Sequence, residues 1–169
     1  MKFVIINGPC GVGKTSVSKL VHQEWSMSLL LPIDELRRLY SGFRQAREES
    51  MMLTNEMGRA MARVSLNHGH SVILEGLKTR QDLLDPWVQL AREHQADVYE
   101  YMLWAPKDLV LRRADERGYR PGGLLTPEKV ERFWDELDAL RTTRPGMIEL
   151  DAEHHTPKEL ADSILRSLS

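Results

Sequence analysis

A chain of 169 residues is long enough for one well-packed domain and short for two, so we expect a single domain over residues 1–169. Its 23 basic and 25 acidic residues give a net charge of −2, which excludes attachment to nucleic acid through the overall field and leaves only a local basic site. The single cysteine excludes an internal disulfide, and the lack of a signal peptide or a long apolar run predicts a cytoplasmic protein without a membrane partner.

Short apolar runs rich in β-branched residues alternate with longer amphipathic segments, which is typical of an α/β fold with a parallel sheet covered by helices. The expected strands are residues 2–7, 28–33, 71–75, 98–104 and 146–150. The expected helices are residues 14–25, 34–40, 49–68, 80–95, 106–117, 127–140 and 157–168.

The first expected strand leads into Gly-Pro-Cys-Gly-Val-Gly-Lys-Thr at residues 8–15, the G-x-x-x-x-G-K-[ST] pattern of a phosphate-binding loop. Its glycines let backbone N–H groups face phosphate oxygens, and the next helix adds the positive end of its dipole. Lys14 is expected to reach the β- and γ-phosphates, Thr15 to bind Mg²⁺ and Ser16 to contact the α-phosphate. A ligand-free turn is the alternative, but the position between strand and helix disfavours it. The expected nucleotide-binding residues here are Gly8, Cys10, Gly11, Val12, Gly13, Lys14, Thr15 and Ser16.

With this loop in place, the chain resembles the P-loop kinases, a superfamily of small phosphotransferases. The superfamily includes adenylate, shikimate and gluconate kinases, chloramphenicol phosphotransferase, zeta toxins and polynucleotide 5′-hydroxyl kinases. The resemblance covers nearly the whole chain in element order, although only a few short motifs carry it. It implies a P-loop NTPase fold, a three-layer sandwich with a five-stranded parallel sheet in the order 2-3-1-4-5. It also implies ATP and Mg²⁺ as cofactors and a helical lid, here around residues 112–126.

Asp34 and Arg37 follow the second expected strand, and their spacing places them on one face of a first helical turn. A carboxylate beside the γ-phosphate can accept the proton of an incoming hydroxyl, and a guanidinium can neutralise charge or hold an acceptor anion. The spacing is similar to that of polynucleotide kinases, where the aspartate is the base, and of adenylate kinases, where the arginine holds the monophosphate. An aspartate helix cap beside a solvated arginine is the structural alternative.

Glu75 ends the third expected strand, next to the P-loop in the implied topology. Members of the superfamily often hold Mg²⁺ through water with an acidic residue at this place, so Glu75 is a candidate metal residue. Adenylate kinases have Asp-Gly-Phe-Pro-Arg here, whereas this chain has Glu-Gly-Leu-Lys-Thr-Arg at residues 75–80. The difference disfavours a nucleoside monophosphate as the acceptor.

Arg113 and Arg117 lie four residues apart on one expected helix, and Arg120 follows in a loop that contains Pro-Gly-Gly. In the superfamily such lid arginines stack on adenine and grip phosphates, and the loop residues allow the lid to move. A solvated charged face at a helix end is the alternative.

Two sets of residues near the acceptor side have no motif. The long central helix carries methionines that we expect to fill the core, namely Met51, Met52, Met57 and Met61. Four arginines could line an acceptor pocket, but the sequence does not place them: Arg44, Arg47, Arg59 and Arg63.

These patterns favour an ATP- and Mg²⁺-dependent phosphotransferase that moves the γ-phosphate to a hydroxyl or phosphate of a small-molecule acceptor, in a monomer or homodimer. Its expected catalytic residues are Lys14, Asp34, Arg37, Arg113 and Arg117. The alternatives are a polynucleotide 5′-hydroxyl kinase, a nucleoside monophosphate kinase and, in another class, a nucleotide-hydrolysing regulatory or binding protein. Nucleic acid is not the favoured partner, and the sequence leaves the acceptor unidentified.

Overall fold

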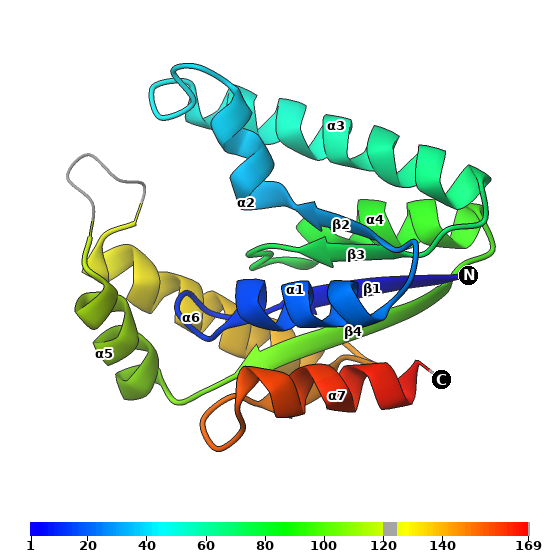
Figure 1. The fold of residues 1–169 in the computed structure, drawn as a ribbon. Coiled ribbons are helices and arrows are strands. Elements are labelled where there is room, and N and C mark those ends of the chain that lie inside the picture. Colours follow the sequence, from blue (N-terminus) through cyan, green and yellow to red (C-terminus); the bar gives the residue numbers. More distant parts are fainter. Residues whose placement is uncertain (120–124, 169) are drawn as a thin grey trace.

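The computed structural model describes residues 1–119 and 125–168, and its centre is a parallel sheet (Figure 1). The strands lie in the order β2-β3-β1-β4-β5, and all of their pairings are parallel. Their bounds are β1 (Lys2–Asn7), β2 (Leu29–Pro32), β3 (Val72–Glu75), β4 (Asp97–Trp104) and β5 (Ile148–Asp151). The expected strand order is confirmed, and the bounds agree with the expected ones to within two residues.

The helices also follow the expected order, with one difference after β2. The segment expected as one helix over residues 34–40 forms a single α-helical turn, α2 (Ile33–Leu36), and a 3₁₀ turn, η1 (Arg37–Leu39). The others are α1 (Lys14–Glu24), α3 (Arg47–Asn67), α4 (Gln81–Glu93), α5 (Lys107–Arg117), α6 (Pro127–Thr143) and α7 (Pro157–Ser167). Among the described residues, none of these helices has the length and apolar character needed to cross a membrane.

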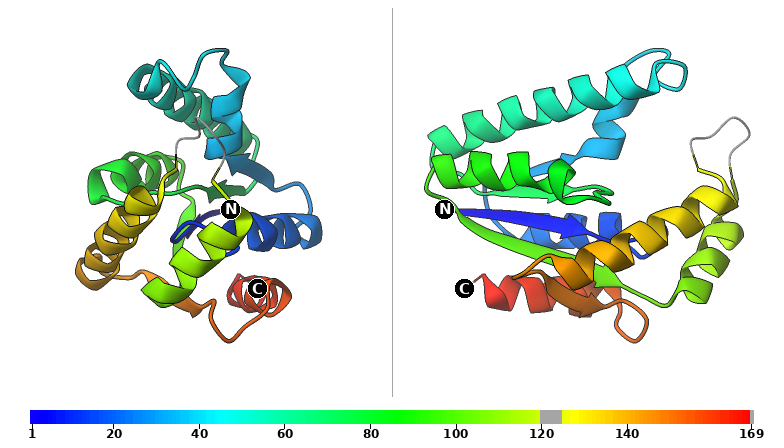
Figure 2. Two further views of the ribbon diagram at one scale, coloured as in Figure 1. Left: turned by 90° about the vertical axis from the view of Figure 1, so that its left-hand side faces the viewer. Right: turned by 180° about the vertical axis from the view of Figure 1, so that it is seen from behind.

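Both faces of the sheet are covered by helices, which Figure 2 shows from two further sides. Alternate residues of β1 point to opposite faces. Phe3 and Ile5 belong to a core shared with α3, α4 and the end of α6, whereas Val4 and Ile6 belong to a core shared with α1, α5 and α7. Burial on both faces explains why β1 is a continuous apolar run rather than an alternating one.

The carboxyl ends of parallel strands lie at one edge of the sheet, where open α/β sheets bind ligands. The loop that joins β1 to α1, the turn α2 and the helix α5 all lie on this side of the molecule (Figure 1). The topology therefore brings together three segments that are far apart in the chain.

Three of the four methionines of α3 are exposed, contrary to expectation, and the fourth, Met57, is half-buried. Met51, Met52 and Met61 are 44%, 55% and 36% exposed, so the expectation that they fill the core is wrong for these three. The side of α3 that packs against the rest of the protein is instead formed by Ser50, Thr54, Gly58, Ala62 and Leu66. Mostly small residues at i, i+4 spacing let this helix approach its neighbours closely.

Gly58 marks the tightest point of that contact, because an added Cβ would lie 2.8 Å from Cδ1 of Ile33 and 2.9 Å from Cη2 of Trp87. We expect Gly58→Val to lower the free energy of unfolding by about 1–3 kcal/mol through overpacking. The control Ala60→Val, at an exposed position of the same helix, should cost only about 0.5 kcal/mol. Urea denaturation measures both variants, and equal losses would contradict the close packing at Gly58.

Candidate active site

The loop after β1 has a backbone that only glycine adopts easily. Gly8, Gly11 and Gly13 have φ angles of +147°, +79° and +101°. Gly8 also passes so close to β4 that an added Cβ would lie 2.4 Å from the carbonyl oxygen of Leu103. Gly13 is the N-cap of α1 and gives it no side-chain cap, so the first N–H groups of this helix are available to an anion.

Lys14 is 8% exposed and folds back under the loop. Its Nζ donates hydrogen bonds of 2.8 Å to the carbonyl oxygens of Gly8 and Pro9. Cys10 is buried within the same loop, and this burial raises the pKa of its thiol, although the Lys14 ammonium opposes the rise. Val12 is also buried, whereas Ser16 is exposed. The loop is thus closely packed around one cation.

Thr15 and Glu75 meet between the start of α1 and the end of β3. The Thr15 hydroxyl donates a 3.3 Å hydrogen bond to Oε1 of Glu75. Burial raises the pKa of Glu75, and the Lys14 charge opposes this shift. In the part of the chain that the structure describes, no group of three or more acidic, histidine or cysteine side chains could hold a metal ion. The pair still fits Mg²⁺, which prefers oxygen ligands and needs only one or two from protein when phosphates and water supply the rest.

Asp34 is exposed on α2, two residues after the end of β2, whose last residue Pro32 pairs with Glu75 of β3. Its carboxylate acts on the pKa of both Cys10 and Glu75, and it raises each of them. Asp34 thus lies at the carboxyl edge of the sheet, the edge at which open α/β sheets bind ligands.

Arg37 follows Asp34 at the start of η1, and its guanidinium bonds to residues of α3. No ion pair joins Arg37 to Asp34 in the described part of the chain. Nε of Arg37 donates a 2.9 Å hydrogen bond to Oγ of Ser50, and a terminal nitrogen donates to the backbone oxygen of Arg47. Burial lowers the pKa of Arg37, and Asp34 opposes the shift. Arg37 therefore ties η1 to the start of α3.

Helix α5, which carries Arg113 and Arg117, packs against the P-loop: an added Cβ at Gly11 would lie 3.6 Å from Cβ of Arg113. Nη1 of Arg113 donates a 3.1 Å hydrogen bond to the carbonyl oxygen of Ala152, just after β5, while Arg117 is exposed at the end of the helix. Arg120 and part of the expected lid lie outside the described residues. Arg113 thus connects α5 to the loop that precedes α7.

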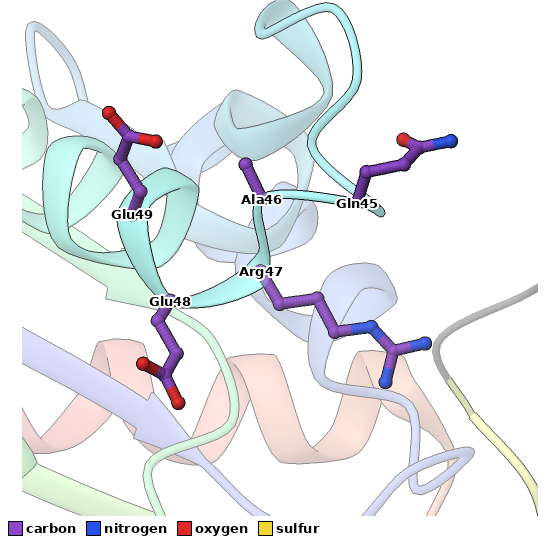
Figure 3. A pocket seen from close by; sticks show the side chains of 5 residues that line it. All are labelled: Gln45, Ala46, Arg47, Glu48 and Glu49. Carbon is purple, nitrogen blue, oxygen red and sulfur yellow. The ribbon is translucent and has the colours of Figure 1, made fainter.

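The four arginines whose position the sequence left open lie on the outside of α3 or next to it. Arg47 lines an open hollow of 350 Å³ together with Gln45, Ala46, Glu48 and Glu49, and its side chain extends away from α3 (Figure 3). A second hollow of 210 Å³ between α3 and α4 is lined in part by Arg59 and Arg63. Arg44 is exposed and its guanidinium lies 5.5 Å from the ring centre of Phe43. Neither hollow includes a residue of the P-loop.

Asn7 and Lys78 also lie at the carboxyl edge of the sheet, and no sequence pattern pointed to either of them. Oδ1 of Asn7 accepts hydrogen bonds from the backbone nitrogens of Gly8 and Lys78, at 2.9 and 3.1 Å, and its Nδ2 donates a 2.7 Å bond to the carbonyl oxygen of Lys78. The available signals were an amide directly before the first loop glycine and a lysine three residues after Glu75. Neither is informative without the contact between them.

Most of the chain matches a known protein family. A family model described as an AAA domain matches residues 3–140. The chain belongs to this AAA domain family. The match includes residues 3–7 of β1, the P-loop, Asp34, Glu75 and all of α5, and it supports the expected membership of the P-loop kinase superfamily.

Solved structures share the fold of this AAA domain at low identity. The tunicamycin resistance protein of Deinococcus radiodurans matches with a TM-score of 0.68 and 19% identity, over 99% of this chain and 95% of that one. A gluconokinase from Sinorhizobium meliloti matches at 0.66 and 14%, over 99% and 91%. Shikimate kinase from Aquifex aeolicus matches at 0.65 and 15%, over 98% and 95%. A search of curated proteins found no match. The structural likeness therefore establishes the fold and not the acceptor.

The close passage at Gly8 can be tested against another glycine with positive φ. Gly8→Ala should destabilise the protein more than Gly69→Ala, by about 1–3 kcal/mol, because both strain the backbone but only Gly8 also meets a backbone oxygen. Nucleotide binding should weaken in Gly8→Ala alone, since the loop must shift. Thermal denaturation and binding of a fluorescent ATP analogue measure the two effects. Equal behaviour of the two variants would show that the approach to Leu103 does not constrain the loop.

Proposed function

We propose that this AAA domain is an ATP- and Mg²⁺-dependent phosphotransferase that moves the γ-phosphate of ATP to a hydroxyl, or to a phosphate, of a small-molecule acceptor. One observation carries the proposal: Asp34 follows β2, whose last residue Pro32 pairs with Glu75 of β3, at the same edge of the sheet as the P-loop that follows β1. A carboxylate beside a phosphate-binding loop is the arrangement that phosphoryl transfer to a hydroxyl needs.

ATP would bind with its phosphates at the N-terminus of α1. The uncapped N–H groups after Gly13 would bind phosphate oxygens, and Lys14 would exchange its two carbonyl partners for oxygens of the β- and γ-phosphates. Thr15 and Glu75 would hold Mg²⁺, Thr15 directly and Glu75 through water. The metal, when bound, neutralises charge on the transferred group.

On the acceptor side of the site, Asp34 would act as general base, and α5 would form part of a lid. Asp34 would orient the acceptor hydroxyl and accept its proton. Arg37 would act through the position of α3, given its bonds to Ser50 and Arg47. Arg113, Arg117 and Arg120 would close a lid around residues 112–126 over the nucleotide, with Arg113 already linked to the loop at Ala152. Exclusion of water by the lid favours transfer over hydrolysis.

A panel of acceptors tests the proposal directly. ATP with a labelled γ-phosphate is offered to sugars, sugar acids, nucleosides, nucleoside monophosphates, antibiotics and 5′-hydroxyl oligonucleotides, with Mg²⁺ present. Transfer to a small molecule supports the proposal. Transfer to oligonucleotides alone would identify a polynucleotide kinase instead, and hydrolysis that no acceptor outcompetes would favour a regulatory nucleotide-hydrolysing protein.

Lys14→Ala should abolish phosphate transfer without unfolding the protein. The ammonium neutralises charge on the β- and γ-phosphates, and its loss is expected to cost several kcal/mol in the transition state. Lys19→Ala, at an exposed position of the same helix, is the matched control and should keep full activity. Near-normal transfer by Lys14→Ala, measured with labelled ATP, would remove Lys14 from the mechanism.

Asp34→Asn should lower the transfer rate by about 10²- to 10⁴-fold, because the amide has the same shape but accepts no proton. ATP binding and slow background hydrolysis should persist. Glu35→Gln changes the adjacent exposed carboxylate and should have little effect. Unchanged transfer in Asp34→Asn would leave Asp34 as a structural residue, and loss of ATP binding would assign it to the Mg²⁺ shell.

A further inference from the structure

Lys78 is a buried cation whose position is set by the P-loop itself. Its backbone nitrogen and carbonyl oxygen are both bonded to the side chain of Asn7, and the same Asn7 oxygen accepts from Gly8 at the start of the loop. Asn7 is fully buried, so this connection is shielded from water. These bonds therefore fix the position of Lys78 relative to the P-loop, which would bind the γ-phosphate.

The Lys78 ammonium lacks the partners that a buried charge needs. The residue is 6% exposed, and its Nζ donates one hydrogen bond, of 3.0 Å, to Oδ1 of Asn55 on α3. No carboxylate lies within ion-pair distance of it in the described part of the chain. A neutral amide oxygen satisfies only one of the three ammonium protons.

Burial and a neighbouring cation further disfavour the charged form of Lys78. The Lys78 ammonium and the Arg59 guanidinium lie 5.9 and 5.8 Å from the ring centre of Trp87, so two cations share one aromatic side chain. Burial lowers the pKa of Lys78 to about 8, and Arg59 adds to this fall, whereas Asp34 and Glu75 oppose it from a distance. A buried charge without an ionic partner is costly to the fold.

We propose that Lys78 binds an anionic group of the acceptor, a carboxylate or a phosphate, beside the hydroxyl that Asp34 faces. This inference rests on the proposed function. Asp34 and Lys78 follow the adjacent parallel strands β2 and β3, whose last residues Pro32 and Glu75 pair, so one small molecule can place its hydroxyl at Asp34 and its anion at Lys78. The anion would supply the charge-assisted hydrogen bonds that the protein does not. Neutral analogues of the acceptor would bind more weakly.

Binding of small anions tests this without an active enzyme. The Nζ and Cε signals of Lys78 are followed by NMR in lysine-labelled protein and assigned by their loss in Lys78→Arg. Mg-ADP fills the P-loop, and acetate, inorganic phosphate or neutral acetamide is added at matched ionic strength. Acetate or phosphate should raise the pKa of Lys78 by about 1 or more, as a close opposite charge does, and acetamide should not. No response to either anion, or an equal response to acetamide, overturns the proposal.

Variants test the same point in the reaction. With an anionic acceptor found by the panel, Lys78→Met should raise the acceptor KM by at least about 10-fold, the usual effect of losing a hydrogen bond to a charge, with the ATP KM unchanged. Lys78→Arg should recover part of the loss, and Lys19→Met is the exposed control. An unchanged acceptor KM in Lys78→Met overturns the proposal.

Two measurements distinguish a failure of this proposal from unfolding of the variant and from a failure of the proposed function. The melting temperature of Lys78→Met should stay the same or rise, because a poorly compensated buried charge is removed; if this variant unfolds, the anion titration of the unaltered protein decides alone. If the acceptor panel shows no transfer, the proposed function fails, and the response of Lys78 to acetate still reports on its own anion site.

Discussion

The close passage of Gly8 against β4 is the constraint on which the site depends. β1 lies between β3 and β4, so the chain must leave the centre of the sheet through a narrow gap. Only a residue without a Cβ can pass the carbonyl oxygen of Leu103 there. Asn7, directly before it, bonds to both Gly8 and Lys78 and thereby joins the exits of β1 and β3. The start of α1, with Lys14 and Thr15, is placed by these contacts.

The two buried lysines at this edge of the sheet differ in how well the protein compensates their charge. Lys14 is held by two carbonyl oxygens and lies near enough to Glu75 to oppose the rise in its pKa. Lys78 has one amide partner and no close carboxylate among the described residues. Such imbalance is typical of sites that receive a charged ligand, because the ligand supplies the missing partner. On the proposed function, ATP and the acceptor would supply the partners in turn.

Much of the fold could be predicted from the sequence because its signals are local. Apolar periodicity located the strands and helices, and the spacing of glycines, lysine and threonine identified the P-loop. The strand order came from the resemblance to P-loop kinases, since periodicity alone does not say which strands pair. The expectation was wrong for three methionines of α3 because helical spacing shows that residues share a face, not which face is buried. The packing face is set by Gly58, whose neighbours Ile33 and Trp87 are distant in the chain.

The sequence by itself determined the α/β class, the phosphate-binding loop and the candidates Asp34 and Glu75, because each is a short pattern with a local physical meaning. The tertiary structure decided which of these residues lie close together. It brought Thr15 to Glu75, 60 residues away, and Asn7 to Lys78, 71 residues away. It also joined Arg37 to Ser50 and Arg47 of α3. Contacts of this kind arise from the parallel pairing of β1 with β3 and from the packing of α3, and no local pattern encodes them.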